Sequence, residues 1–262
     1  MLTDTEGIVL RQVKTSYGRR MILLFTKKYG KISAGTSIGE KGRSRSSLAL
    51  RPFTFGHYEL FRNRDSYNIN GADVVKAYYR IGEDVDKYMN GAYVLEFTEK
   101  VLGENVPAPG VFTLLVDFLN LLEDRDRGIG TLVLAYQTKL MKSLGVMPVL
   151  ERCTVCGRAM DDEDAAEGCG RSFFSIENGG IVCDRCAVKI LQSDEEKTTG
   201  NSLIYQSEFG IIGVLKYFSA NPLKKLKNVA LSESTGKLLQ QILREYAAYY
   251  LDVSDIKSEK MI

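Results

Sequence analysis

The sequence predicts a multidomain α+β protein, in which a strand-rich N-terminal domain precedes a helical domain interrupted by a cysteine-rich insert. Three observations predict this class. Short apolar stretches alternate with turn residues over the first eighty of the 262 residues. Apolar residues then recur at spacings of three and four from about residue 82 onward. Two C-x-x-C pairs lie between the helical stretches. We therefore expect domains at residues 1–80, 81–150, 151–190 and 191–262, the second and fourth forming one helical domain.

The N-terminal domain should contain five short strands, at residues 7–13, 21–25, 31–38, 53–61 and 67–69. Strands this closely spaced are typical of a small barrel of SH3-like or OB type. Residues 39–47, with the sequence GEKGRSRSS, separate the third strand from the fourth. Because this stretch is rich in Gly, Ser and basic residues, we expect it to be a mobile loop.

The helical domain is predicted from apolar stripes that should face its core. The helix at residues 111–122 is apolar nearly all round and should be central. Ser207 is expected to cap the helix that carries Ile211, Leu215 and Phe218. The stripes are Val85, Tyr88, Met89 and Ala92; Leu132, Tyr136, Leu140 and Leu144; Ile211, Leu215 and Phe218; and Leu238, Ile242, Tyr246 and Tyr250.

The cysteine-rich insert predicts a structural zinc site. Cys153 and Cys156 are separated by 26 residues from Cys183 and Cys186. Two residues between cysteines let both sulfur atoms of a turn reach one ion, and two such turns give zinc its preferred tetrahedron. Residues 171–176, a turn at Asn178-Gly179-Gly180 and residues 181–183 read as the hairpin of a zinc ribbon. The alternative is two unrelated pairs of buried cysteines.

The remaining candidates for chemistry argue against an enzyme. Four cysteines would fill the metal's coordination shell, whereas a catalytic zinc keeps a position open for water, as a metal-dependent hydrolase would require. The one histidine, His57, is expected to be a barrel residue rather than a ligand or base. Cys169 is interpreted as a spare thiol, with an alternative ligand as the other possibility. Neither a phosphate-binding glycine loop nor a Gly-x-Ser-x-Gly elbow is present.

Charge is distributed unevenly along the chain. Residues 1–80 carry 15 Lys and Arg against 6 Asp and Glu, a net charge of +9, whereas residues 81–151 carry −5 and residues 152–262 carry −2. A basic excess confined to one domain attracts polyanions, although a solvated basic face is the alternative. Tyr17 and Tyr29, at turns, are candidates for stacking on bases. The residues expected to bind DNA are Arg11, Lys14, Arg19, Arg20, Lys31, Lys41, Arg43, Arg45 and Arg51.

The chain's start and hydropathy bear on where it works. The first residues, MLTDTEGIVLRQ, lack a basic-then-apolar signal, and no run of eighteen apolar residues occurs. We expect a cytoplasmic protein with no membrane partner. Thiols stay reduced in that compartment, which favours metal ligation over disulfides.

The order of these motifs resembles that of the RecO family of DNA repair and recombination proteins. The matching stretches are residues 7–11, 17–18, 26–31, 39–48, 50–53, 144–148, 153–157, 179–186, 250–251 and 256–258. The resemblance implies an N-terminal OB-fold, a helical domain and an inserted zinc ribbon. It also implies binding to single- and double-stranded DNA, strand annealing, partnership with RecR, and contact with the C-terminal tail of single-stranded DNA-binding protein (SSB) at the nucleoid. With RecR, the family helps load recombinase onto DNA coated by SSB.

Two features depart from the family pattern. Arg19 and Arg20 stand where an acidic residue is expected, and Cys169 lies beside an acidic run at residues 161–164. The basic N-terminal domain and the lack of a catalytic centre favour a stoichiometric mechanism, in which a basic barrel binds phosphates and brings two strands together. The alternative is a zinc-ribbon protein–protein adaptor without direct DNA binding, which salt-dependent binding to oligonucleotides would distinguish.

Overall fold

The computed structural model describes residues 1–14, 20–39, 44–64, 66–160, 172–195, 203–207 and 210–258. The chain forms two compact units. The first comprises Met1–Ile129 together with Asp255–Ile262, and the second comprises Gly130–Ser254. The prediction of a mixed α+β protein, with a strand-rich N-terminal part and a helical C-terminal part, is confirmed.

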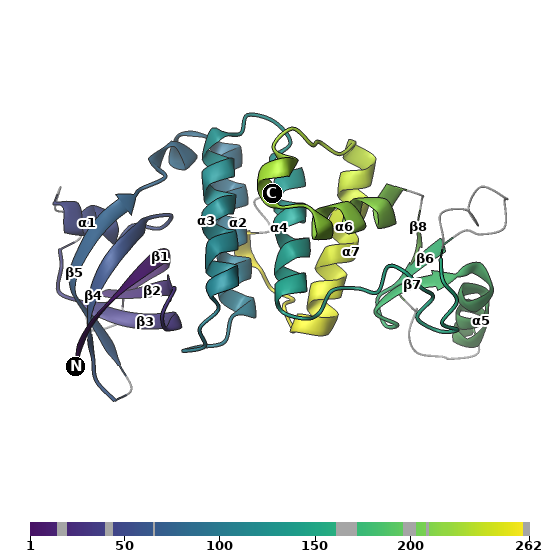
Figure 1. Cartoon of the computed structure of the whole chain (residues 1–262), viewed down its shortest axis with the longest axis horizontal. Helices are drawn as coiled ribbons and strands as arrows, with labels where there is room; N and C mark the ends of the chain where they lie inside the picture. The colour runs from purple at the N-terminus through teal and green to yellow at the C-terminus, as the bar shows by residue number, and fades with distance from the viewer. Residues whose placement is uncertain are drawn as a thin grey trace. The chain divides into compact units, whose positions relative to one another are not determined.

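The N-terminal strands form a closed barrel in the order β1-β2-β3-β5-β4 (Figure 1). All neighbouring pairs are antiparallel except β3 with β5, which is parallel and short. Large apolar side chains fill the barrel, among them Val9, Leu24, Ile32 and Tyr58. The strands are β1 (Leu2–Lys14), β2 (Arg20–Thr26), β3 (Gly30–Thr36), β4 (Phe55–Arg62) and β5 (Tyr67–Lys76).

A short helix, α1 (Arg45–Ala49), joins β3 to β4, and it corrects the expectation that residues 39–47 form a loop throughout. The Ser44 side chain accepts a hydrogen bond from the Ser47 backbone N–H and so caps the helix. Ala49 is buried in the barrel core, and the Tyr58 hydroxyl donates to its carbonyl at 2.7 Å. Burial of Ala49 thus fixes the end of a segment whose polar composition indicated a loop. Residues 40–43 lie outside the described chain.

The first unit also contains the 3-10 helix η1 (Tyr79–Glu83) and helices α2 (Val85–Val101) and α3 (Pro109–Asp124). α3 buries apolar residues along most of its length, as predicted. The stripe predicted for α2 is wrong at its start, because Val85 is 72% exposed and Tyr88 49% exposed. Lys87 lies on the buried face instead, where its ammonium donates to the Glu123 carbonyl at 3.0 Å near the end of α3. A buried lysine whose ammonium donates to a backbone carbonyl cannot be predicted from the spacing of apolar residues.

The second unit contains α4 (Ile129–Ser143), α6 (Gly210–Ala220), the 3-10 helix η2 (Leu223–Leu226) and α7 (Glu233–Leu251). The predicted stripes are largely confirmed, since the following residues are buried: Leu132, Tyr136, Leu140, Ile211, Leu215, Phe218, Ile242 and Tyr246. Leu144, Leu238 and Tyr250 are not fully buried. Ser207 does not cap α6, because it pairs with Ser172 in a β-ladder.

The insert folds as a three-stranded sheet in the order β7-β6-β8, and α5 (Asp184–Glu195) lies between β7 and β8 in the chain. Its strands are β6 (Ser172–Ser175), β7 (Gly180–Cys183) and β8 (Ile204–Ser207). The predicted hairpin of β6 and β7 is confirmed, with Ser175 opposite Gly180. β8 was not predicted, because this strand has only four residues and comes directly after a long polar stretch. Phe174 of β6 packs edge-on against Tyr246 of α7, which attaches the sheet to the helices of the second unit.

Candidate metal centre and nucleic-acid interface

The first cysteine pair lies in a tight turn that begins after Arg152. The Gly157 N–H donates to the Cys153 carbonyl at 2.9 Å, and Gly157 has a φ of +74°, which favours glycine. Arg152 and Ala159 form an isolated antiparallel bridge that closes the turn. The backbone therefore aims Cys153 and Cys156 toward a common point.

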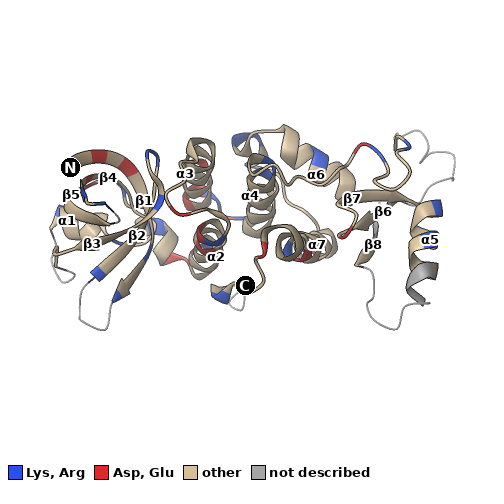
Figure 2. Cartoon of the chain, turned by 90° about the horizontal axis from the view of Figure 1, so that it is seen from below, with Lys and Arg blue, Asp and Glu red and all other residues tan. Residues whose placement is uncertain are grey.

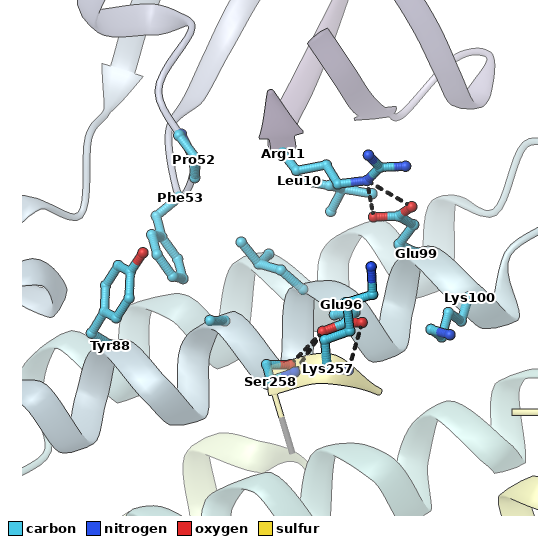
Figure 3. A pocket seen from close by; sticks show the side chains of 12 residues that line it. Leu10, Arg11, Pro52, Phe53, Tyr88, Glu96, Glu99, Lys100, Lys257 and Ser258 are labelled. Atoms are coloured by element: carbon cyan, nitrogen blue, oxygen red, sulfur yellow. Dashed lines mark hydrogen bonds and ion pairs between the residues drawn. The ribbon is translucent and has the colours of Figure 1, made fainter. Parts of the chain in front are cut away.

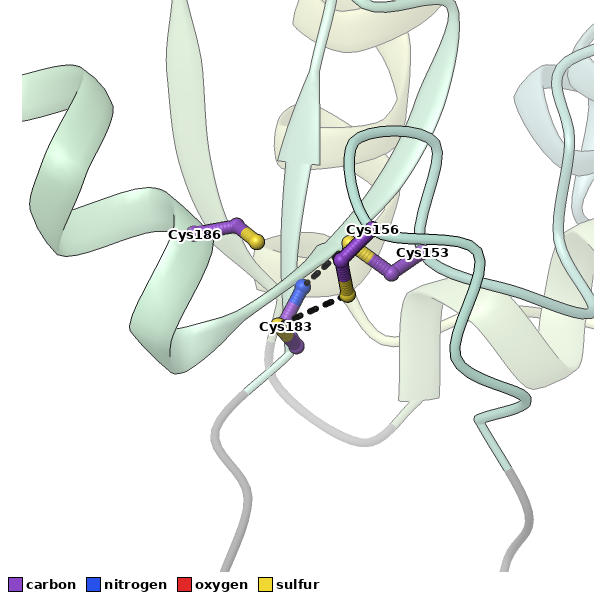
Figure 4. Close-up of side chains that lie close together, drawn as sticks. All are labelled: Cys153, Cys156, Cys183 and Cys186. Carbon is purple, nitrogen blue, oxygen red and sulfur yellow. Dashed lines mark hydrogen bonds between the residues drawn. The ribbon is translucent and has the colours of Figure 1, made fainter.

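The second pair comes from the junction of β7 and α5, as Figure 4 shows. Cys183 is the last residue of β7, and Cys186 lies in the first turn of α5. The four sulfur atoms all lie within 4.8 Å of one another, and those of Cys156 and Cys183 are 3.8 Å apart. A tetrahedron with metal–sulfur bonds of about 2.3 Å has sulfur–sulfur edges of about 3.8 Å. The four cysteines could hold one metal ion.

The environment of the thiols fits such an ion. Cys153, Cys183 and Cys186 are buried, Cys156 is exposed, and all four are free of disulfides. Burial raises the pKa of Cys153, but backbone N–H donors, Cys156 foremost, outweigh it and lower that pKa to about 6. Burial and the neighbouring sulfur atoms raise the pKa of Cys186 to about 12. Full deprotonation of the cluster therefore needs a compensating cation.

Arg20, at the start of β2, contacts the ends of the two neighbouring strands. Lys14 pairs with Arg20, and Arg20 pairs with Thr36 across the sheet. The Arg20 guanidinium also donates to the Ile38 carbonyl at 2.7 Å. Four of the predicted site residues lie outside the described residues, namely Tyr17, Arg19, Lys41 and Arg43.

Three of the predicted DNA-binding residues are held within the first unit. The Arg11 Nε donates to both carboxylate oxygens of Glu99 on α2, at 2.9 and 2.7 Å. The Lys31 ammonium donates to the Glu99 carbonyl at 2.7 Å, near the C-terminus of α2. Arg20 bonds Gln12 as well as Ile38, and its Nε is buried without a partner in the described chain. Much of the basic excess thus contacts the protein itself.

The other predicted residues differ in their exposure. Lys14, Arg45 and Arg51 are exposed, the first at the end of β1 and the other two on and just after α1. Figure 2 shows both basic and acidic positions on the barrel and on α2. His57 is exposed on β4.

Tyr29 is partly buried at the turn between β2 and β3, where other side chains already contact it. Its hydroxyl lies 2.6 Å from the Thr3 hydroxyl oxygen, and its ring centroid lies 5.8 Å from that of Tyr67. The guanidinium of Arg62 lies 5.7 Å from the Tyr29 ring centroid, and the Lys28 ammonium 5.6 Å from it. These side chains surround part of the Tyr29 ring and so reduce the surface on which a base could stack.

The first unit contains a cavity of about 500 Å³ that the sequence did not indicate. Its walls come from β1, from the residues after α1, from α2 and from residues 257–258 (Figure 3). Phe53 and Tyr88 meet edge-on at one end, with ring centroids 5.6 Å apart. Arg11 and its partner Glu99 stand at the other end.

Comparison with known protein families matches nearly the whole chain. A family model described as "Recombination protein O N terminal" matches residues 1–78, and one described as "Recombination protein O C terminal" matches residues 82–260. The chain belongs to the RecO family. The resemblance noted in the sequence motifs is therefore confirmed at the level of the family.

Curated relatives agree with this membership in RecO. A "DNA repair protein RecO" of Exiguobacterium sibiricum is 31% identical over 95% of this chain and 92% of its own. Proteins of the same name from Alkaliphilus metalliredigens and a Thermoanaerobacter species are each 27% identical. The former match covers 96% of this chain and 95% of the relative, and the latter 100% and 97%. Among the described helices of this RecO family member, none is long and apolar enough to cross a membrane.

Sequence patterns missed the cavity because its residues are dispersed. Tyr88 belongs to a stripe predicted to face the core, and Phe53 begins a predicted strand. Lys257 and Ser258 are about 160 residues from Glu96, whose carboxylate they contact. The one signal for these two residues is the motif at residues 256–258, which belongs to the family pattern.

Proposed function

We propose that this chain is a DNA-binding recombination mediator that acts in DNA repair without a catalytic centre. It binds and anneals single-stranded DNA, also binds double-stranded DNA, and with RecR helps load recombinase onto SSB-coated DNA at the nucleoid in the cytoplasm. Membership in the RecO family and the repair function named for the curated relatives support this proposal. Partnership with RecR and with the C-terminal tail of SSB follows from the family alone.

We propose further that the barrel is an OB-fold and forms the DNA-binding domain of residues 1–80. The strand order β1-β2-β3-β5-β4, with a helix between β3 and β4, supports this assignment. OB-folds bind single strands through a face flanked by the loop between the first two strands and the loop between the last two. In this chain the first of these loops comprises residues 15–19, and the two residues that flank it in the sequence, Lys14 and Arg20, pair between β1 and β2.

The observation that carries the proposal is the exposure of predicted cations on the described part of the barrel domain. Lys14 at the end of β1, Arg45 on α1 and Arg51 just after it are all exposed. Annealing requires charge neutralisation, because two phosphate chains otherwise repel each other. Exposed cations on one domain would neutralise the phosphates of both strands and need no chemical turnover.

We propose that the four cysteines bind one zinc ion per chain and that the ion is structural. An all-thiolate tetrahedron suits zinc, with iron as the other ion that prefers such a set. The small sheet β7-β6-β8 has little apolar core of its own, so the metal would replace apolar burial. Four sulfur ligands occupy every position of a tetrahedral ion, which supports a role in folding rather than in catalysis.

Charge reversal at the loops tests the proposal. The double substitution Arg43→Glu and Arg45→Glu should weaken binding to a fluorescent oligo-dT at least tenfold at low salt and flatten its salt dependence. The matched control reverses Lys225 and Lys227, which are exposed on and beside η2 in the second unit. Zinc content should be unchanged in both variants. Equal binding by the wild type and the loop variant at low and high salt would remove the loops from the mechanism.

A protein–protein adaptor is the second candidate, and one observation favours it. The cysteine-rich insert exposes Val155 in the first turn and Val188 and Leu191 on α5. Exposed apolar residues of this kind occur at protein interfaces. An adaptor without DNA binding would leave the oligonucleotide unbound even at the lowest salt concentration.

A further inference from the structure

The cavity between the barrel and α2 combines an aromatic wall with a basic rim. Phe53 is buried after α1 and has a φ of +65°, and Tyr88 stands across from it on the first turns of α2. Because Tyr88 remains 49% exposed, its ring offers surface to a ligand within the cavity. Leu10 and Leu95 extend the apolar wall from β1 and α2.

Three cations line the same cavity. Arg11 projects from β1, Lys100 from the last turn of α2, and Lys257 from the C-terminal segment, and all three are exposed (Figure 3). Arg11 bonds Glu99 through Nε only, so Glu99 does not engage its two terminal amino groups. The guanidinium is thus held in place while it presents donors outward.

The two carboxylates at the rim are already engaged. Glu99 accepts both bonds from Arg11. Glu96 accepts from the backbone N–H groups of Lys257 and Ser258, both at 2.9 Å, and from the Ser258 hydroxyl at 2.6 Å. These bonds hold the carboxylates to protein donors and position two of the three cations, Arg11 and Lys257.

We propose that this cavity binds one nucleotide of single-stranded DNA, with the base against Tyr88 and Phe53 and the phosphate on Arg11, Lys100 and Lys257. This inference rests on the proposed function and adds a site to it. Proteins bind single strands by combining a basic track for the backbone with aromatic side chains on which bases stack. The volume of about 500 Å³ falls in the range of small-ligand sites and accommodates a base.

A second exposed cation on β1 favours a nucleotide of a longer strand over other anions. Arg11 and Lys14 are three residues apart on β1, a distance of about 10 Å along a strand, and both are exposed. A single strand of DNA that contacts Lys14 can therefore reach the cavity within one or two nucleotides. The cavity would add a base contact to these contacts with phosphate.

The test uses the full-length chain and an oligo-dT containing one 5-iododeoxyuridine. Irradiation should cross-link the base to Tyr88 or Phe53, identified by mass spectrometry. Tyr88→Ala should weaken binding to oligo-dT about tenfold, in line with the loss of one base stack, and Tyr88→Phe should preserve it. Binding to an abasic oligonucleotide of the same length should be the same in Tyr88→Ala and wild type, because only the base contact is lost. Tyr249→Ala, at an exposed tyrosine on α7, is the matched control and should bind as wild type.

The outcomes separate this site from the proposed function. If wild type does not bind oligo-dT at low salt, the proposed function fails. If wild type binds but Tyr88→Ala binds equally and cross-links map elsewhere, the cavity is not a nucleotide site. Reversal of Lys100 and Lys257 to Glu provides a second arm, in which unchanged affinity also overturns the site. If an acidic peptide with an apolar C-terminus occupies the cavity and oligo-dT does not displace it, the cavity is a peptide site and the inference is wrong.

Discussion

The Arg11 guanidinium on β1 donates from Nε to both carboxylate oxygens of Glu99 on α2, at 2.9 and 2.7 Å. The hydrogen bond to Glu99 raises the pKa of Arg11, against a smaller opposing effect of burial, so the guanidinium stays charged. The side chains are 53% and 18% exposed. An ion pair this accessible to water stabilises the protein little, which leaves positioning of Arg11 as its main effect.

Removal of the Glu99 charge should strengthen DNA binding. Glu99→Gln keeps an oxygen that can accept from the Arg11 Nε, so Arg11 stays in position, but it deletes a negative charge close to the proposed phosphate contact. The affinity for oligo-dT should therefore rise about threefold at low salt. The free energy of unfolding should fall by less than about 1 kcal/mol. Fluorescence anisotropy and urea unfolding measure the two quantities.

Glu233→Gln is the matched control for this charge change. Glu233 is exposed on α7 and pairs with Lys237 on the same helix. It should leave oligo-dT affinity unaltered. Weaker binding by Glu99→Gln than by wild type would mean that the negative charge of Glu99 assists DNA binding, which would contradict this prediction.

Substitution of the buried cysteines should remove the metal. Cys153→Ser or Cys183→Ser deletes one thiolate of four, and the zinc content should fall from one ion per chain toward zero. The sheet β7-β6-β8 should then become sensitive to protease, because it loses the ion that replaces its core. Metal analysis by mass spectrometry and limited proteolysis provide the readouts.

Cys169→Ser is the control for the cysteine variants, since Cys169 lies outside the described residues and is interpreted as a spare thiol. It should retain one zinc per chain. A Cys153→Ser protein that keeps full zinc and resists protease would contradict a four-cysteine site.

Gly30 is required where the turn between β2 and β3 meets the segment after α2. Its φ is +71°, and an added Cβ would lie 2.0 Å from the Val106 carbonyl oxygen. Gly30→Ala should lower the free energy of unfolding by more than about 1 kcal/mol. Gly213→Ala on α6, where no described atom outside the helix's own backbone lies within 4 Å of the added carbon, should instead raise it by about 0.5–1 kcal/mol. Urea unfolding of both variants measures these opposite signs.

Acid should release the contact between Glu96 and the C-terminal segment. Burial raises the pKa of Glu96, but the hydrogen bonds from Ser258 and Lys257 outweigh it, so the net pKa is lowered from 4.5. A carboxyl group with a lowered pKa stabilises the folded state above its unfolded pKa and loses this effect as the pH falls through the folded value. Ser258→Ala should therefore cost about 1 kcal/mol at pH 7 and almost nothing at the lowest pH at which the protein still folds.

Unfolding of wild type and Ser258→Ala between pH 7 and pH 3 tests this dependence. Ser254→Ala, at an exposed serine of the same segment, is the control. A Ser258→Ala deficit that stays constant across the range would show that the Glu96 carboxylate is not its source.

Local patterns predicted much of the fold because the relevant interactions are local. Apolar spacing gave α3 and most of α4 and α6, and the turn at residues 178–180 gave the β6–β7 hairpin. Cysteine spacing indicated a cluster that the structure brings together within 4.8 Å. The residues that determine each helix or the hairpin lie within one element or one turn, and each cysteine pair spans only four residues of the chain.

Features that depend on long-range contacts could not be predicted in this way. Lys87 lies on the buried face of α2 because a carbonyl of α3 accepts a hydrogen bond from its ammonium. Arg11 and Lys31 counted toward a basic surface, yet both contact Glu99, which is 88 and 68 residues away. A count of charges cannot tell a cation that binds DNA from one that binds its own protein.

The most direct test of the account is the affinity of the full-length chain for oligo-dT across salt concentrations from 50 to 500 mM. Cations that neutralise several phosphates release counterions, so the logarithm of the affinity should fall linearly with the logarithm of the salt concentration. The slope should be about −0.7 per phosphate, or roughly −3 for four contacts. No measurable binding at 50 mM salt, or a slope near zero, would contradict DNA binding by the basic barrel.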